Sequence, residues 1–296
     1  MSRRLLITQD HAKKCSLSTF LDQLTKAAVS PIVSRRRVRA VRVSSEGTPC
    51  MTERSLDGRT AFVSGSGRNI GRAVAVRLAQ LGCNVVVNGS SSEDACRETA
   101  RLVEAAGARA LVAMGDVSRS DAMARIAETA LAEFGTVDVV VNNAARRPHK
   151  PFLETSDADW HAVVDGALTA SFSSARAFLP GMVEKGWGRV INFAGMKAIR
   201  GYFEGAPISA AKHGVWGLTK ALSQEFGPKG VTVNAISPGQ IRSETATQDD
   251  PARVATIPVG FMGTPGDIAA VVAFLASPEA RFVNGQMLAV NGGETT

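Results

Sequence analysis

A glycine-rich turn between an expected strand and an expected helix constrains the fold of this chain most. Residues 60–64 form a short apolar run, and a helical period of apolar residues follows over 70–81. The turn between them carries glycine at positions 65, 67 and 71. Glycine lets the backbone turn sharply and approach a pyrophosphate, which then binds at the positive N-terminus of the helix. The turn therefore predicts a dinucleotide-binding strand–helix unit.

The same alternation of apolar runs and helical segments continues along the chain. Further strands are expected at residues 84–88, 110–113, 137–141, 189–193, 231–235 and 287–290. Each run is apolar on both sides, as are the strands of a parallel sheet that is buried on both faces. This alternation predicts an α/β fold, a single Rossmann-type doubly wound parallel sheet with helices on both faces. One such domain accounts for residues 51–296.

The first fifty residues differ from the rest in charge. Residues 1–54 hold eleven Lys and Arg against four Asp and Glu, which is the whole net charge of +7, while the remainder holds 23 of each sign. A short amphipathic helix after Ser16 would share one apolar face, formed by Leu17, Phe20, Leu21 and Leu24. Three interpretations of residues 1–50 stay open: a disordered basic arm, a targeting or partner-binding peptide, or translated sequence upstream of a natural start at Met51.

Charge, hydropathy and cysteine spacing exclude several classes of partner. The region after residue 54 has no excess of basic residues, so no nucleic-acid partner is predicted. No apolar run approaches the roughly 20 residues of a membrane helix, so no membrane association is expected. The four cysteines (Cys15, Cys50, Cys83 and Cys96) have neither CxxC nor metal-site spacing. That pattern predicts no metal site and is typical of a reduced, cytoplasmic protein.

Further motifs follow the expected strands in a fixed order. Asp-Val at residues 116–117 follows the third strand, and Asn-Asn-Ala-Ala at 142–145 follows the fourth. Ser-Pro-Gly-Gln-Ile at 237–241 follows the sixth strand, and Val-Asn-Gly-Gly at 290–293 follows the last. Together with the glycine-rich turn, these motifs resemble those of the short-chain dehydrogenase/reductase family over residues 57–293.

The glycine-rich turn of that family reads TGxxxGxG. Gly65 and Gly71 match it, whereas Ser64 replaces its Thr and Asn69 its middle Gly. Asn tolerates left-handed backbone angles better than most residues, so the turn is expected to keep its shape. The resemblance implies that the following residues bind the cofactor: Gly65, Arg68, Asn69, Ile70, Gly71, Asn88, Asp116, Val117, Asn143, Ala144, Ala145, Lys212, Pro238, Gly239 and Ile241.

The end of the second strand favours NADP as that cofactor. An NAD-specific site usually carries Asp or Glu there, where it binds the ribose 2′-hydroxyl. Residues 88–91 read Asn-Gly-Ser-Ser and hold no carboxylate that would repel a 2′-phosphate. Arg68 stands in the glycine-rich turn, where the resemblance implies a contact with that phosphate.

The residues that carry the family's chemistry are mostly replaced. The resemblance implies a Tyr that donates a proton, a Lys four residues later, an orienting Ser and a supporting Asn. Lys212 matches the Lys, but Ile208 stands at the Tyr position, Gly195 at the Ser position and Ala167 at the Asn position. The only tyrosine of the chain, Tyr202, is a second catalytic candidate beside Lys212, and its alternative interpretation is an ordinary loop aromatic.

Three functions fit this combination. The first is an NADP-dependent oxidoreductase of a small-molecule substrate, similar to the 3-oxoacyl-[acyl-carrier-protein] reductase branch but with atypical or weakened carbonyl reduction. The second is a reductase of iminium or enone substrates that need no protein acid. The third is a catalytically silent NADP-binding partner or sensor. The resemblance also implies a homotetramer, paired through helices matching residues 160–185 and 205–227.

Overall fold

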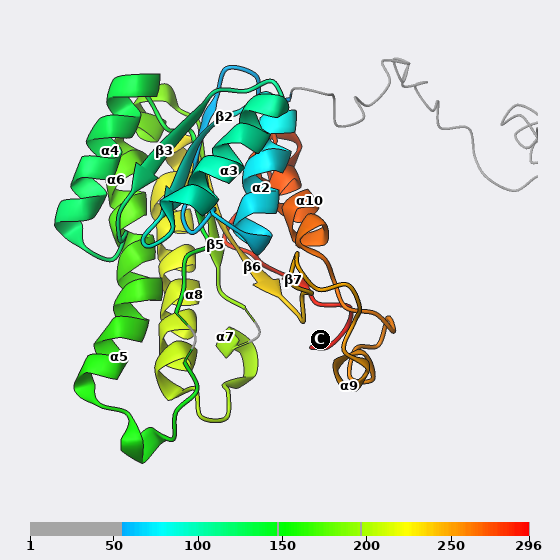
Figure 1. The fold of residues 1–296 in the computed structure, drawn as a ribbon. Coiled ribbons are helices and arrows are strands. Elements are labelled where there is room, and N and C mark those ends of the chain that lie inside the picture. The colour runs from blue at the N-terminus through cyan, green and yellow to red at the C-terminus, as the bar shows by residue number, and fades with distance from the viewer. Residues whose placement is uncertain (1–54, 147, 196, 296) are drawn as a thin grey trace, which may run out of the picture. The chain divides into compact units, whose positions relative to one another are not determined.

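Seven parallel strands form one sheet at the centre of this computed structural model, which describes residues 55–146, 148–195 and 197–295 (Figure 1). The strand order is β3-β2-β1-β4-β5-β6-β7. The strands are β1 (Thr60–Val63), β2 (Asn84–Gly89), β3 (Ala110–Met114), β4 (Val139–Asn142), β5 (Gly188–Phe193), β6 (Val231–Pro238) and β7 (Met287–Val290). The predicted doubly wound parallel sheet is therefore confirmed.

Helices cover both faces of the sheet, as expected (Figure 1). One face carries α2 (Asn69–Gln80), α3 (Glu93–Ala105) and α10 (Pro265–Ala276). The other carries α4 (Ser120–Phe134), α6 (Ala170–Lys185) and α8 (Ala206–Phe226). Three shorter α-helices also lie in the described part of the chain: α5 (Asp157–Val164), α7 (Lys197–Arg200) and α9 (Pro251–Val254).

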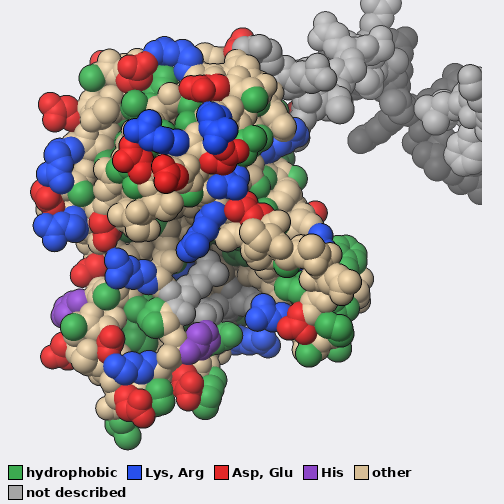
Figure 2. Space-filling model, in the orientation of Figure 1, with side chains coloured by type: hydrophobic (Ala, Val, Ile, Leu, Met, Phe, Trp, Pro, Cys, Tyr) green, Lys and Arg blue, Asp and Glu red, His purple; other side chains and the backbone are tan. Residues whose placement is uncertain are grey.

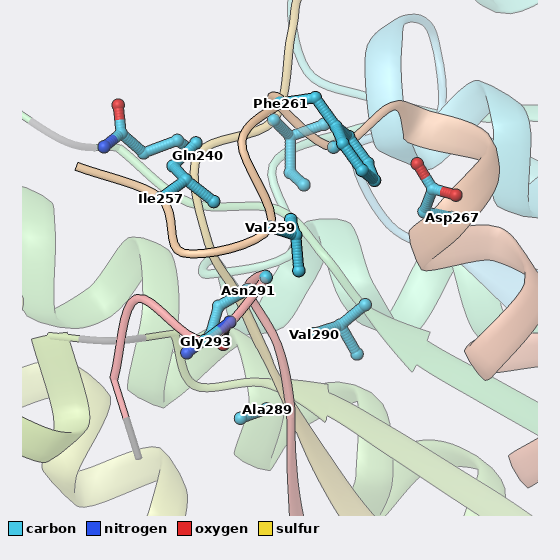
Figure 3. A pocket seen from close by; sticks show the side chains of 12 residues that line it. Gln240, Ile257, Val259, Phe261, Asp267, Ala289, Val290, Asn291 and Gly293 are labelled. Carbon is cyan, nitrogen blue, oxygen red and sulfur yellow. Dashed lines mark hydrogen bonds between the residues drawn. The ribbon is translucent and has the colours of Figure 1, made fainter. Parts of the chain in front are cut away.

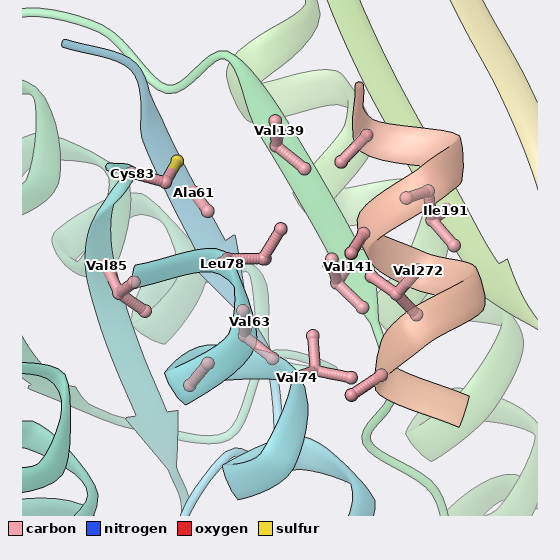
Figure 4. Close-up of a cluster of buried hydrophobic side chains, with 14 of the residues drawn as sticks. Ala61, Val63, Val74, Leu78, Cys83, Val85, Val139, Val141, Ile191 and Val272 are labelled. Atoms are coloured by element: carbon pink, nitrogen blue, oxygen red, sulfur yellow. The ribbon is translucent and has the colours of Figure 1, made fainter. Parts of the chain in front are cut away.

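Two hydrophobic cores, one on each face, explain why the strands read as continuous apolar runs. Ala61 and Val63 of β1 pack into the core under α2, α3 and α10, part of which is drawn in Figure 4. Phe62 between them packs into the opposite core, where its ring lies 5.3 Å from that of Phe178 of α6. Successive side chains of a strand point to opposite faces, so a sheet buried on both faces requires apolar residues at every position.

The strand order reverses between β1 and β4, and this reversal fixes where a ligand binds. The chain leaves β1 toward β2 and β3 on one side, and leaves β4 toward β5, β6 and β7 on the other. The connections therefore diverge at the carboxyl ends of β1 and β4, opening a crevice there. Doubly wound sheets bind ligands at this switch point.

One expected strand begins two residues later than predicted. The apolar run began at Val137, but β4 begins at Val139. The preceding residue, Asp138, is buried, and its carboxylate accepts hydrogen bonds from the Thr60 backbone N–H (2.9 Å) and from Lys185 Nζ (2.8 Å). Asp138 thus ties the entry of β4 to β1 and to the end of α6.

The expectations for the first fifty residues, including the helix after Ser16, lie outside the described residues. No helix in the described part of the chain is long and apolar enough to cross a membrane.

A chain that begins at Met51 should keep the melting temperature and the cofactor affinity of the full chain. The reason is that every strand and helix of the described sheet begins after Met51. Differential scanning calorimetry and cofactor titration measure both quantities. A fall in melting temperature of more than about 4 °C, roughly 1–2 kcal/mol in a domain of this size, would instead make the segment structural.

Candidate functional site

A cleft of about 1330 Å³ lies at the carboxyl ends of the strands. Figure 2 shows the molecule hollowed there, with Lys, Arg and His side chains around the opening. The loops after β1 to β6 line the cleft together with the start of α8. All fifteen residues that the sequence assigns to the cofactor line this one cleft, and Tyr202 lines it too.

The glycine-rich turn has an unusual backbone conformation and leaves no room for a side chain at position 71. Gly65 and Asn69 both have positive φ, +63° and +49°, and Asn69 thus adopts the left-handed conformation expected of it. Its side-chain oxygen accepts a hydrogen bond from the Glu244 backbone N–H at 3.1 Å, which holds the conformation from the loop after β6. A Cβ on Gly71 would lie 2.2 Å from the carbonyl oxygen of Gly65. The turn therefore brings bare backbone to the start of α2.

The end of β4 clamps this turn from the neighbouring strand. Ser64 Oγ accepts hydrogen bonds from the backbone N–H groups of Asn143 and Ala144, both at 3.1 Å. The Asn143 amide returns two hydrogen bonds of 3.0 Å, to the carbonyl oxygens of Ser64 and Gly65. Ser64 thus supplies the hydroxyl that the family's Thr would supply. The turn and the Asn-Asn-Ala-Ala motif form one rigid unit across the switch point.

Asn88 lines the cleft at the end of β2 but uses its side chain for structure. Its amide nitrogen donates to the carbonyl oxygens of Ala113 (2.9 Å) and Gly115 (3.1 Å), and the residue is buried. The amide hydrogens therefore fix β2 to β3 instead of facing a ligand. This use was not visible in the sequence.

Asp116 is an ionised acceptor at the same end of the cleft. Burial raises the pKa of its carboxyl, but two hydrogen bonds from Ser118 and the nearby positive charges outweigh burial and leave the pKa below its usual value. The Ser118 hydroxyl donates to Asp116 Oδ1 at 2.7 Å, and Arg146 Nη2 lies 3.8 Å from Oδ2. Asp116 therefore accepts hydrogen bonds as a carboxylate at neutral pH.

The cleft wall that follows β2 carries no acid. Residues 89–92 and Cys96 line it, and exposed Arg68 lines the cleft from the start of α2. Among the described residues, the carboxylates of the whole cleft are Asp116 and Glu294. The acids nearest to this wall in sequence, Glu93 and Asp94, are not among its lining residues.

Three of the four positions that match the family's catalytic residues meet in the cleft. Lys212 is buried at 4% exposure, and its ammonium donates to the Phe193 carbonyl oxygen at the end of β5. Ile208 and Gly195, which the sequence analysis matched to the family's Tyr and Ser, line the cleft too and have no hydroxyl. The fourth position, Ala167, is buried in a π-helical turn between α5 and α6. It does not line the cleft, but its neighbour Gly166 does.

Tyr202 lies close to Ile208, the residue at the position that the sequence matches to the family's Tyr. A Cβ on Gly205 would be 3.1 Å from Tyr202 Cβ and 3.2 Å from Ile208 Cγ2, so the two side chains flank the same glycine. Tyr202 is 48% exposed, and its ring centroid lies 4.9 Å from that of His149. The backbone N–H of Lys150 donates to the Glu204 carbonyl oxygen at 2.9 Å, which ties the two loops together.

Sequence reasoning missed several residues that line the cleft. They are His149, Arg146, Arg200, Arg253 and Glu294. None of them belongs to one of the motifs that the sequence analysis used, although Arg146 and Glu294 directly follow two of those motifs.

A second, smaller pocket of about 300 Å³ lies between the loop at residues 257–263 and the end of β7 (Figure 3). Ile257, Val259 and Phe261 line it from the loop, and Val290 lines it from β7. Its lining is therefore mainly apolar. Gln240 and Ile241 line both this pocket and the cleft.

Comparisons with known proteins agree with this geometry. The family model described as enoyl-(acyl carrier protein) reductase matches residues 65–295. The acetoacetyl-CoA reductase of Allochromatium vinosum is 40% identical over 240 residues, which cover 79% of this chain and 98% of the relative. The 3beta-hydroxysteroid dehydrogenase 1 of Eggerthella lenta is 37% identical over 247 residues, 81% of this chain and 95% of the relative. A crystal structure of a putative short-chain alcohol dehydrogenase from Sinorhizobium meliloti has a TM-score of 0.77 at 32% identity, covering 82% of this chain and 98% of that one.

Proposed function

The chain belongs to the short-chain dehydrogenase/reductase family, and we propose that it is an NADP-dependent oxidoreductase of a small-molecule substrate with weakened carbonyl reduction. The observation that carries this proposal is the cleft itself, which joins the glycine-rich turn at one end to Lys212 at the other. Bound NADPH supplies a hydride to the substrate carbon. The remaining chemistry is that of the chain's own residues.

The turn fits the pyrophosphate of a dinucleotide. The carbonyl of Gly65 fills the space that a side chain at position 71 would need, so backbone alone borders the start of α2. The N-terminus of α2 carries free backbone N–H groups and the positive end of the helix dipole. Asp116, an ionised carboxylate, suits the amino group of an adenine as a hydrogen-bond donor.

Lys212 is suited to hold the nicotinamide ribose. Its ammonium is buried and anchored on the Phe193 carbonyl oxygen, which fixes its position relative to β5. An ammonium has three donors, and the hydroxyls of a ribose are acceptors that match them.

Proton delivery is the weak step. Ile208 has no proton to donate, and Tyr202 flanks the same glycine from the loop before α8. We assign the proton to the Tyr202 hydroxyl, which gives it to the carbonyl oxygen as the hydride reaches the carbon. A phenol that is 48% exposed is less firmly oriented than a buried one, so simple ketones should react slowly.

The apolar surface of Ile208 beside Gly195 also favours a second candidate reaction, reduction of an iminium or enone that needs no protein acid. A panel of ketones, imines and enones with NADPH, followed at the nicotinamide absorbance band, separates the two reactions. Tight NADPH binding without turnover of any of them would instead indicate a silent partner or sensor.

NADPH should bind at least tenfold more tightly than NADH. The physical reason is that the wall after β2 has no carboxylate to repel a 2′-phosphate and that Arg68 offers a charge-assisted hydrogen bond to it. Titration calorimetry with both nucleotides measures the ratio. Arg68→Ala should remove most of the preference, whereas Arg125→Ala on α4 should leave it intact. Equal affinities in the parent protein would contradict the assignment.

The chain should form a homotetramer through α6 and α8. Phe172 on α6 is a large exposed apolar side chain, with the Arg176 guanidinium 4.8 Å above its ring. Light scattering should give about four times the 31.1 kDa of one chain. Phe172→Glu should lower that mass, whereas Leu131→Glu on α4 should not, although Leu131 is also an exposed apolar side chain (37%, against 44% for Phe172). A monomeric parent protein at micromolar concentration would exclude the assembly.

A further inference from the structure

The cleft concentrates positive charge in a body that is otherwise neutral. Its lining holds Arg68, Arg146, Arg200, Lys212, Arg242 and Arg253, against two carboxylates, Asp116 and Glu294. Beyond residue 54 the chain as a whole has 23 charges of each sign. A cofactor with a pyrophosphate and a 2′-phosphate carries about four negative charges, which match the excess of six cations over two carboxylates. It does not account for the position of each cation along the cleft.

Most of these cations already have partners. Arg146 lies 3.8 Å from Asp116, Arg242 lies 3.2 Å from Asp249, and Arg253 lies 3.3 Å from Asp250. The Lys212 ammonium is bound to the Phe193 carbonyl oxygen. Arg68 belongs to the turn at the opposite end of the site, after β1.

Arg200 is different. Within residues 55–146, 148–195 and 197–295 no carboxylate pairs with it. Arg200 is the last residue of the short helix α7, which lies between Gly195 and Gly201. These two glycines have φ angles of +84° and +68° and form the turns on either side of the helix. Its sequence neighbours Ile199 and Phe203 are exposed apolar side chains, and Tyr202 is two residues away. Among the described residues, Arg200 is therefore a guanidinium without a carboxylate partner that lines the cleft two residues before Tyr202, next to exposed apolar side chains.

We propose that Arg200 binds an oxyanionic group of the substrate, so that the substrate is a carbonyl compound bearing a carboxylate or a phosphate. This inference rests on the proposed function and adds the substrate class. A guanidinium offers two parallel N–H donors that match the oxygens of either group. The reaction balances: the carbonyl carbon gains a hydride from NADPH, its oxygen gains the Tyr202 proton, water returns a proton to Tyr202, and NADP⁺ and a hydroxy acid or hydroxyalkyl phosphate leave.

Titration calorimetry on the full chain saturated with NADP⁺ tests the inference without turnover. The probes are acetoacetate, dihydroxyacetone phosphate and the neutral ketone 4-hydroxy-2-butanone. One of the two anions should bind at least tenfold more tightly than the neutral ketone, and the tighter anion identifies the class. Arg200→Gln should remove that difference, and Arg200→Lys should keep part of it because the charge stays but the two-pronged geometry is lost. Arg125→Gln, the same charge change on α4, should leave it unchanged.

The outcomes separate this inference from the function on which it rests. Equal binding of anionic and neutral probes, or a difference that survives Arg200→Gln, overturns the inference while NADPH binding stands. A loss of NADPH affinity in Arg200→Gln would make Arg200 a cofactor ligand and overturns it as well. A parent protein that binds no NADPH overturns the proposed function itself.

Discussion

Ile208→Tyr should raise the rate of ketone reduction about a hundredfold. Ile208 lines the cleft, follows the loop that carries Tyr202, and precedes Lys212 by one turn of α8. A tyrosine there places a phenol one helical turn from a buried ammonium, which lowers the phenol's pKa and makes it a better acid. Positioned acid–base catalysis is worth about 10²–10⁴ in rate, and the lower end applies because other positions stay altered. Steady-state kinetics with NADPH and a ketone gives kcat directly.

Ile208→Phe is the matched control, because it adds the same ring without the hydroxyl. It should leave kcat near that of the parent, so an equal rise in both variants would mean that side-chain size and not proton donation causes the effect. Tyr202→Phe in the parent should lower the residual ketone reduction at least tenfold and flatten its dependence on pH. Rapid ketone reduction by the parent protein would contradict the proposal that Ile208 at this position weakens proton donation.

Restoring the hydroxyl at position 195 is less promising than restoring the one at 208. Open space surrounds a Cβ built on Gly195, so a serine would not clash there. Its φ of +84°, however, is left-handed, which costs a residue other than glycine roughly 1–2 kcal/mol. A serine at position 195 would therefore be strained, which makes Ile208→Tyr the better test.

The strands could be predicted from the sequence because their physics is local. Val85, Val86 and Val87 alternate between the two cores. Because both faces of the strand are buried, its sequence is an uninterrupted apolar run. The glycine-rich turn could be predicted for the same reason. The lack of space at Gly71 and the left-handed backbone of Asn69 both depend on residues only a few positions away. The lining of the cleft followed from the order of motifs, each of which ends a strand at the same edge of the sheet.

The parts that sequence could not predict depend on distant contacts. The sequence predicts that Asn88 binds the cofactor but not that its amide nitrogen donates to the carbonyl oxygens of Ala113 in β3 and of Gly115 just after it, 25 and 27 residues later. His149 meets Tyr202 across two loops that are more than fifty positions apart, with no spacing rule to connect them. The same holds for Arg200, whose lack of a carboxylate partner among the described residues is a property of its surroundings and not of its sequence.

Gly71→Ala should abolish cofactor binding and lower stability by about 3 kcal/mol or more. The added Cβ would lie 2.2 Å from the Gly65 carbonyl oxygen, 2.8 Å from Ser66 Cα and 2.8 Å from the Asn143 amide nitrogen. Two of these neighbours are backbone and the third is held by two hydrogen bonds, so none can move aside cheaply. Relief requires the turn to separate from α2, and that turn is where we place the pyrophosphate, at the helix N-terminus. We expect NADPH affinity to fall at least a hundredfold, measured by titration, with a lower melting temperature.

Gly266→Ala in the first turn of α10 separates this steric effect from the general cost of replacing a helical glycine. The nearest atom to its added Cβ is Thr264 Oγ1 at 3.5 Å, an ordinary contact. Alanine at such a position is neutral or stabilising by about 0.5–1 kcal/mol, so affinity and melting temperature should hold or rise slightly. If Gly71→Ala matched this control in both measurements, the close approach of backbone at the start of α2 would not be what creates the cofactor site. A loss of affinity in Gly71→Ala alone would tie nucleotide binding to the atoms of Gly65 and Gly71.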